Sequence, residues 1–198
     1  MARLHPVTPA DFDPALRAAL GPAFDDPQGL GLLRVLAQRP DVTAAFLAFR
    51  SALTATSTLP PRLVELVRLR IAFHNQCRSC MALRTASGAA DGVTEDLVCS
   101  LEQPQEAPDL TDAEKAALRY ADLFATDHLA AGDAVFDLLP AHFGEPDIVE
   151  LGVQIAVFVG FGRLSATWDI VDDLPERFHD RDATVAPWGA GTVVADHR

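Results

Sequence analysis

The 198-residue chain has few cysteines, few basic residues and no long uninterrupted apolar run. Its three cysteines are an odd number, and the first residues lack the apolar segment of an export signal. A framework of structural disulfides is therefore not expected, the thiols should be reduced at rest, and the protein is predicted to be cytoplasmic. The longest apolar run, residues 151–162, contains Gln154 and is shorter than the roughly 20 residues that a membrane-spanning helix needs. It is predicted to be a core helix.

Acidic side chains outnumber basic ones by 28 to 16, which gives a formal net charge of −12. This charge would repel phosphate backbones and anionic membrane surfaces, so neither nucleic acid nor a membrane is expected as a partner. Hydrophobic residues make up 49% of the chain and charged residues 22%. That balance is typical of a globular chain, and the length suits one domain with a sizeable core.

Apolar residues recur at helical spacing, and no segment shows the two-residue alternation of a half-buried strand. The predicted fold class is all-α, without a β-sheet. Helices are expected at about residues 13–20, 29–38, 41–54, 62–75, 77–90, 95–101, 112–126, 133–142 and 146–168. The segments 62–75 and 146–168 are apolar nearly all round and are predicted to be the most buried. Thr111 and Glu114 have the spacing of a capping box.

We expect a single helical domain over residues 1–174 and an irregular tail over residues 175–198. The tail loses helical periodicity and contains several glycines and prolines, so it is either disordered or laid over a neighbour. Trp188 favours the second possibility. Residues 61–66 and 146–151 share the pattern Pro-x-apolar-Val-Glu-Leu, which indicates either two related helical halves or a chance similarity.

Cys77 and Cys80 form a Cys-x-x-Cys pair at the start of a predicted helix. The partly positive end of a helix lowers the pKa of a thiol, and this spacing brings the second sulfur within reach, so one cysteine can attack and the other resolve. By this argument alone, the attacker would be Cys77. Zinc would need a second ligand pair, and no second Cys-x-x-Cys or His-x-His follows, so no metal is expected. Two buried, inert cysteines are the remaining alternative, which the polar Arg78 and Ser79 disfavour.

Glu65 lies in a strongly apolar helix, twelve residues before Cys77. A buried glutamate is unfavourable unless paired, and a raised pKa would suit it to exchange protons with a thiol. The structural alternative is a salt bridge with one of the neighbouring arginines, which are Arg62, Arg68, Arg70 and Arg84. His74 is a candidate proton relay or a structural residue. Cys99 has apolar neighbours and is predicted to belong to the core.

Residues 59–67, Leu-Pro-Pro-Arg-Leu-Val-Glu-Leu-Val, followed by Asn-Gln-Cys-Arg-Ser-Cys at 75–80, resemble the core motif of the alkylhydroperoxidase D-like and carboxymuconolactone decarboxylase family. Arg-Pro-Asp at 39–41 and Phe-Gly-Arg-Leu at 161–164 are similar too, so the likeness covers roughly residues 30–170. In that family a glutamate, two cysteines and nearby histidines reduce peroxides through a proton relay.

The resemblance implies that Cys80 attacks the peroxide, Cys77 resolves the product and Glu65 is the relay carboxylate. It also implies that no prosthetic group is needed and that the protein is a homo-oligomer, a trimer or a hexamer built of trimers. The family pattern has histidines where this chain has Ser79 and Arg84. Arginine cannot exchange protons, but positions 80 and 84 would share a helix face, so Arg84 is expected to pair with the Cys80 thiolate or with Glu65.

The leading hypothesis is a thiol-dependent peroxidase, or a related disulfide oxidoreductase, that acts on small hydroperoxides and is regenerated by an unknown protein or thiol reductant. Turnover is expected to be weak because both relay histidines are missing. A cofactor-free decarboxylase of the carboxymuconolactone type is an alternative that leaves the cysteine pair unexplained. A helical oligomer with a redox-sensing or vestigial cysteine pair is a third hypothesis, which the loss of the histidines favours and the retention of Glu65 with both thiols does not.

Overall fold

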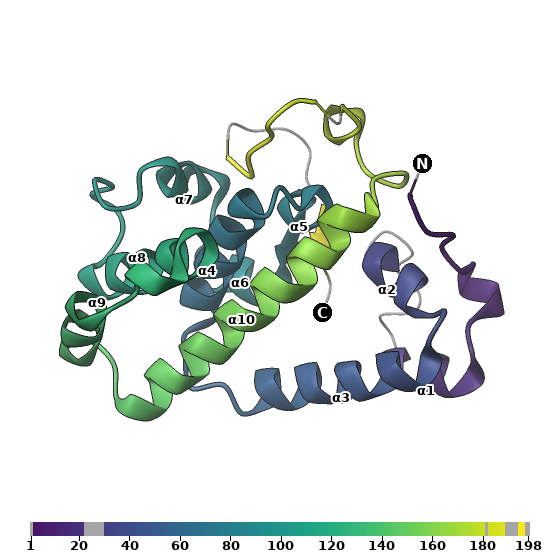
Figure 1. Cartoon of the computed structure of the whole chain (residues 1–198), viewed down its shortest axis with the longest axis horizontal. Coiled ribbons are helices and arrows are strands. Elements are labelled where there is room, and N and C mark those ends of the chain that lie inside the picture. Colours follow the sequence, from purple (N-terminus) through teal and green to yellow (C-terminus); the bar gives the residue numbers. More distant parts are fainter. Residues whose placement is uncertain (1, 22–29, 181, 189–193, 197–198) are drawn as a thin grey trace.

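The computed structural model describes residues 2–21, 30–180, 182–188 and 194–196, and within these ranges the chain is built almost entirely of helices (Figure 1). The α-helices are α1 (Pro14–Leu20), α2 (Gly31–Leu36), α3 (Pro40–Ala55), α4 (Pro61–His74), α5 (Arg78–Ala82), α6 (Ala86–Ala90), α7 (Glu95–Cys99), α8 (Asp112–Thr126), α9 (Asp133–Leu138) and α10 (Glu145–Trp168). Short 3₁₀ helices lie at Pro9–Asp11, Ser100–Glu102, His128–Ala130, Leu139–Ala141 and Glu176–Phe178. The all-α prediction is confirmed, although Gly29 of the expected second helix lies outside the described residues.

Local sequence determines where several helices begin. Proline occupies the first turn of α1, α3, α4 and α10, where a missing amide hydrogen breaks no helical hydrogen bond. At the start of α8, Thr111 Oγ1 accepts the Glu114 amide at 3.2 Å, and a Glu114 carboxylate oxygen accepts the Thr111 amide at 2.8 Å. The predicted capping box is therefore confirmed.

The central helix of the main core is α4, which packs against α8 and α10. Seven of its 14 residues are buried, as predicted for this segment. The prediction for α10 is wrong, because only six of its 24 residues are buried. Its buried positions are Leu151, Gln154, Ile155, Val159, Gly162 and Ser165. They form a stripe that faces mainly α4, while Val149, Val153 and Leu164 are apolar side chains of α10 that remain exposed.

By length and composition alone, α10 could span a membrane. Its stripe of buried residues and its packing against α4 are typical of a core helix. Figure 1 shows α10 running across the molecule, with α8 and α9 toward one side and α1, α2 and α3 toward the other. The helices α1 and α2 have a smaller apolar core of their own, and α3 contacts α10 through the stacked rings of Phe46 and Phe161, whose centroids are 3.8 Å apart.

The helix predicted at residues 77–90 is divided into α5, the strand β1 (Leu83–Thr85) and α6. The chain becomes extended at Leu83, with φ −95° and ψ 148°. The strand β1 pairs in parallel with β2 (Val194–Asp196), so that Leu83 lies opposite Val194 and Thr85 opposite Asp196. The expectation of no β-sheet is therefore wrong in this detail. These six residues do not change the fold class.

The described part of the C-terminal tail packs on its own chain. Phe178 is fully buried against Met81 and Ala82, and the ring of Trp188 lies 4.5 Å from the ring of Phe73. Gly189 and Gly191 of the predicted tail lie outside the described residues.

Cys99, which was predicted to be a core residue, is exposed at the end of α7. The apolar neighbours Leu97 and Val98 are buried, because their side chains point in other directions around the helix.

Candidate active site

A left-handed residue connects α4 to the cysteine pair. Gln76 has φ 48°, and it turns the chain so that Cys77 becomes the N-cap of α5. The Gln76 side chain donates to the carbonyl oxygen of Val185 and accepts the amide of the same residue, both at 3.1 Å. The turn that precedes the cysteines is therefore attached to the C-terminal tail.

A disulfide links Cys77 and Cys80, whose Cα atoms are 5.2 Å apart. The two cysteines differ in access, because Cys77 is fully buried whereas Cys80 is partly exposed and lines a cavity. Two donors lie near Cys77 Sγ: the Cys80 amide at 3.3 Å and the Ser79 hydroxyl at 3.6 Å. Ser79 Oγ is also 2.8 Å from Ser165 Oγ of α10.

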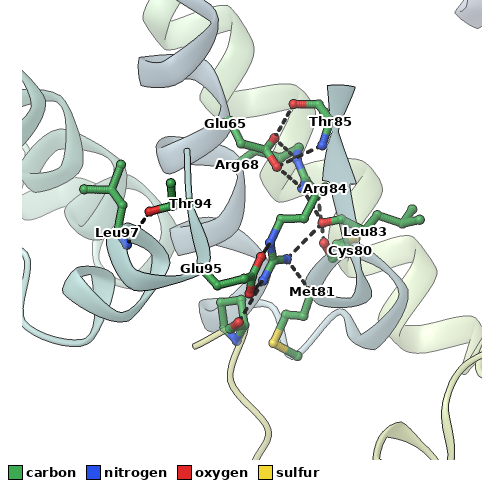
Figure 2. A network of polar contacts seen from close by, with 11 residues as sticks. Glu65, Arg68, Cys80, Met81, Leu83, Arg84, Thr85, Thr94, Glu95 and Leu97 are labelled. Carbon is green, nitrogen blue, oxygen red and sulfur yellow. Dashed lines mark hydrogen bonds and ion pairs between the residues drawn. The ribbon is translucent and has the colours of Figure 1, made fainter. Parts of the chain in front are cut away.

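Glu65 is buried beside α5, which is called the cysteine helix below because it carries Cys77 at its N-cap and Cys80. Glu65 is paired with Arg68, one turn further along α4 (Figure 2). Arg68 Nε donates to one carboxylate oxygen and Nη2 to the other, both at 2.7 Å. Thr85 adds its amide at 3.1 Å and its hydroxyl at 2.9 Å. Both carboxylate oxygens therefore have donors, as an ionised buried group requires.

Burial raises the pKa of Glu65, but the charge of Arg68 and the hydrogen bonds from Arg68 and Thr85 lower it by more, so the pKa lies below its usual range. The sequence predicts a raised pKa for Glu65, which would suit a proton relay, whereas the structure shifts the pKa in the opposite direction. The reason is that burial comes with a fixed cation and two further donors. Glu65 is held as a carboxylate, which accepts protons poorly.

Arg68 also connects Glu65 to the backbone of the cysteine helix. Its Nη1 donates to the carbonyl oxygen of Cys80 and its Nη2 to that of Leu83, both at 2.8 Å. In a continuous helix the Cys80 carbonyl would accept the amide of residue 84. Because Arg68 occupies this carbonyl, and the Thr85 amide binds Glu65 instead of continuing the helix, side chains of α4 satisfy backbone groups where α5 ends.

The expectation that Arg84 pairs with Cys80 or Glu65 is wrong. The Arg84 guanidinium binds Glu95, with Nε and Nη2 at 2.8 and 3.0 Å from the two carboxylate oxygens (Figure 2). It also donates to the carbonyl oxygens of Met81 and Pro187. The prediction assumed a continuous helix, whereas the extended backbone at Leu83 removes the one-turn relation between residues 80 and 84. Arg84 therefore links α5, α7 and the tail.

His74 has a partner on α8 in place of a cysteine. Its Nε2 lies 2.7 Å from Asp122 Oδ1, and Arg70 Nε donates to the same oxygen at 2.6 Å. Burial raises the pKa of Asp122, but the hydrogen bonds and charges of His74 and Arg70 lower it by more, so the pKa lies below its usual range. This arrangement accounts for His74 as a structural residue that joins α4 to α8.

The cavity beside Cys80 has a volume of about 230 Å³ and lies between α2, α3, α4, α5 and α10. Most of its wall is apolar, and its polar side chains include Arg50, Arg68, Ser79 and Ser165. Its larger apolar residues are Leu33, Phe46, Leu47, Phe158, Phe161 and Ile170. The cavity can therefore hold a compact apolar molecule next to a sulfur atom and two cationic side chains.

Sequence reasoning named Cys77, Cys80 and Glu65, which the structure brings to one site, and Arg84 and His74, which it places in other contacts. It did not single out Thr85 or Ser165, and it offered Arg68 only as one of four possible partners of Glu65. Ser165 is a polar residue on the buried stripe of an apolar helix, which was an available signal. Among the described residues, no group of three or more His, Cys, Asp or Glu side chains is arranged to hold a metal ion.

Comparisons with known proteins agree with this fold. Residues 40–123 match the carboxymuconolactone decarboxylase family. Over 152 residues the chain is 35% identical to the uncharacterized protein Rv2313c of Mycobacterium tuberculosis, a match that covers 74% of this chain and 53% of that protein. It is 28% identical to the uncharacterized protein YnjA of Escherichia coli over 121 residues, 61% of this chain and 64% of that protein. The chain thus spans about half the length of the mycobacterial relative.

Two solved structures share the fold. One is the alkylhydroperoxidase AhpD core of an uncharacterized peroxidase-related protein from Ralstonia eutropha, with a TM-score of 0.69 and 22% identity over 90% of this chain and 94% of that one. The other is a protein of unknown function from Agrobacterium tumefaciens with a suggested role in antioxidant defence, with a TM-score of 0.59 and 23% identity over 67% of this chain and 90% of that one. The chain therefore has the alkylhydroperoxidase D-like fold, and its residues 40–123 match the carboxymuconolactone decarboxylase family.

Proposed function

We propose that the chain is a thiol-dependent peroxidase in which Cys80 attacks an organic hydroperoxide and Cys77 resolves the oxidised product. The observation that carries the proposal is the difference in access between two sulfur atoms close enough to form a disulfide. Cys80 lines the cavity, and Cys77 is fully buried behind it. A peroxide in the cavity can approach Cys80, so this geometry supports the roles that the family resemblance implies.

The proposed reaction has two steps. The Cys80 thiolate attacks one peroxide oxygen, the O–O bond breaks, and the products are a sulfenic acid on Cys80 and an alkoxide that takes up a proton to become an alcohol. The Cys77 thiol then attacks the Cys80 sulfur, the S–O bond breaks, and the hydroxyl group leaves as water with the thiol proton. An external dithiol reduces the resulting disulfide and is itself oxidised to a disulfide. No prosthetic group takes part in these steps.

The cavity wall supports an organic hydroperoxide with a compact apolar body as the substrate. Burial of apolar surface against Phe46 and Phe161 would favour such a molecule over hydrogen peroxide, which has no apolar part. Arg68 lines the cavity and donates to the Cys80 carbonyl at 2.8 Å, so its charge lies near the reacting sulfur. We propose that this charge stabilises the thiolate and the departing alkoxide.

Turnover should be weak, because Glu65 is ionised and fully hydrogen-bonded and both family histidines are replaced. The same two observations favour a second candidate, a redox sensor whose cysteine pair is oxidised once without repeated turnover. A cofactor-free decarboxylase is a third candidate, supported by the family match alone, and it gives the cysteine pair no role.

A thiol titration followed by a turnover assay separates these candidates. Free thiols are counted before and after one equivalent of cumene hydroperoxide, and peroxide consumption is then followed with excess dithiothreitol. A peroxidase loses two thiols and consumes many equivalents of peroxide. A sensor loses two thiols but consumes no more than a dithiothreitol blank after the first equivalent. If all three thiols survive the peroxide, both proposals are contradicted and the decarboxylase is left.

We also propose that the protein is a soluble, cytoplasmic homo-oligomer, a trimer or a hexamer of trimers, with a thiol or protein reductant and neither nucleic acid nor a membrane as a partner. The assembly is supported by apolar side chains that the single chain leaves exposed, including Val42 and Phe49 on α3 and Val149 on α10, which is 66% exposed. Sedimentation velocity of the wild type and of Val149→Glu tests it. A wild type that sediments as a monomer at micromolar concentration would contradict the assembly.

A further inference from the structure

Two hydroxyl groups form a chain that ends at the buried sulfur atom. Ser79 Oγ lies 3.6 Å from Cys77 Sγ and 2.8 Å from Ser165 Oγ. A disulfide sulfur carries no hydrogen, so Ser79 is the donor in the contact with Cys77. Each hydroxyl has one hydrogen, and Ser165 therefore donates to Ser79. Ser165 is buried on α10, and none of the peroxide-reducing steps above uses it.

We propose that Ser79, held in position by Ser165, stabilises Cys77 as the leaving thiolate when an external thiol attacks Cys80. The inference rests on the proposed thiol–disulfide chemistry, but it does not require peroxide turnover. In the attack, the incoming thiolate forms a bond to Cys80 Sγ, the Cys77–Cys80 bond breaks, and the electron pair stays on Cys77 Sγ. The second thiol of the dithiol then attacks its own mixed disulfide, Cys80 leaves as a thiolate, and the reductant becomes a disulfide.

Access determines which sulfur atom is attacked. Cys77 is fully buried, and both residues that flank it are bound to the C-terminal tail. Gln76 binds Val185, and Arg78 Nη2 donates to the carbonyl oxygens of Asp180 and Ala183 at 2.6 and 2.9 Å. Cys80 is partly exposed and lines the cavity. An incoming thiol therefore meets Cys80 first, and Cys77 is the leaving group.

Hydrogen bonding determines how readily Cys77 leaves. A thiolate in a fully buried position is unfavourable unless donors replace the lost water. The structure supplies the Cys80 amide at 3.3 Å and the Ser79 hydroxyl at 3.6 Å. A leaving thiol whose thiolate is stabilised departs faster, so the Ser79 contact should accelerate the first reduction step. Ser79 touches the reacting sulfur, whereas Ser165 acts through Ser79 and is a positioning residue.

The test follows reduction of the oxidised protein by dithiothreitol in the absence of peroxide. Ser79→Ala should slow reduction by roughly tenfold, because it removes a hydrogen bond to a developing charge. Ser79→Thr keeps a hydroxyl and should restore most of the rate. Ser165→Ala should slow reduction less than Ser79→Ala, and the double variant should be no slower than Ser79→Ala alone. The matched control is Ser87→Ala, an exposed serine on α6, which should reduce at the wild-type rate.

A second measurement identifies the sulfur that is attacked. Oxidised protein is treated briefly with glutathione, quenched in acid and mapped by mass spectrometry, and glutathione should be found on Cys80. Glutathione on Cys77, or equal reduction rates for the wild type, Ser79→Ala and Ser79→Thr proteins with unchanged thermal unfolding, would overturn the inference. A wild type that lacks peroxide turnover while Ser79→Ala still slows reduction would contradict the proposed peroxidase and leave this inference standing.

Discussion

Arg68 and Glu65 form a bidentate ion pair in which each guanidinium nitrogen involved lies 2.7 Å from its carboxylate oxygen. The same guanidinium donates to the carbonyl oxygens of Cys80 and Leu83. Glu65 therefore holds the residue that shapes the end of the cysteine helix. Its contribution to the site is the position of Arg68, and this role explains why a carboxylate is needed in an otherwise apolar stretch of α4.

Replacing Glu65 by glutamine should lower the free energy of unfolding at neutral pH by about 3–5 kcal/mol, because Arg68 would lose the carboxylate that compensates its buried charge. The pKa of Glu65 is lower in the folded protein than in the unfolded chain. The stabilisation is therefore complete above the usual value of about 4.3 and is lost as the pH falls through the lower folded-state pKa. Urea unfolding of both proteins from neutral pH to about pH 3 measures the effect. Glu106→Gln, at an exposed position, is the control, and a difference that widens in acid would contradict the prediction.

The two cysteines should give different products with peroxide. In Cys77→Ser a sulfenic acid should accumulate on Cys80, because no resolving thiol is present, and Cys80→Ser should consume no peroxide above the blank. Dimedone labelling with peptide mapping measures the first result. Both proteins should carry Cys99→Ser as well, because Cys99 is exposed and free. Oxidation of Cys77 in Cys80→Ser at the wild-type rate would reverse the assigned roles.

Arg84 should matter for stability and for attachment of the tail. Arg84→Ala removes the pair with Glu95 and the donors to the carbonyl oxygens of Met81 and Pro187, so unfolding should become easier by about 1–3 kcal/mol. Limited proteolysis should cleave the tail of this variant sooner than that of the wild type. Arg84→His should not raise peroxide turnover, because position 84 does not face Cys80. A rise in turnover with histidine at this position would restore the relay interpretation.

Gly88 should tolerate no side chain. A Cβ atom there would lie 2.7 Å from Glu65 Cβ and Cγ and 2.8 Å from Thr85 Oγ1, and both Gly88 and Glu65 are buried. Gly88→Ala should therefore destabilise the protein by about 1–3 kcal/mol, as overpacking does. Gly160→Ala is the matched control, because nothing lies within 4 Å of the added atom on α10. The control should be neutral or more stable, since alanine favours a helix. Equal melting temperatures for the two variants would show that the contact at Gly88 is easily relieved.

Phe161→Ala should change substrate preference. It removes one ring of the Phe46–Phe161 stack in the cavity wall, whose centroids are 3.8 Å apart. The kcat/KM for cumene hydroperoxide should fall by about tenfold through loss of apolar contact, whereas that for hydrogen peroxide should change little. Leu164→Ala, on the exposed face of the same helix, is the control. Parallel loss with both peroxides would mean that the variant disturbs Cys80 itself.

Several features follow from the sequence because they depend on short or regular spacings along the chain. Apolar periodicity predicts the helices, Thr111 and Glu114 predict the capping box, and the spacing of Glu65, Cys77 and Cys80 predicts the members of the site. Each of these relations is local or repeated along the chain, so no knowledge of packing is needed to recognise it.

Only the tertiary structure decided which partners these residues have. The choice of Arg68 for Glu65, and of Glu95 for Arg84, depends on the break at Leu83, where side chains from α4 replace helical backbone hydrogen bonds. The contact between Ser79 and Ser165 joins residues 86 positions apart. The exposure of α10 depends on how many neighbours surround it, and an apolar sequence does not reveal that number. The assembled fold thus decided which partners these buried polar groups have, because a buried charge or hydroxyl is stable only where the fold supplies a donor or an acceptor.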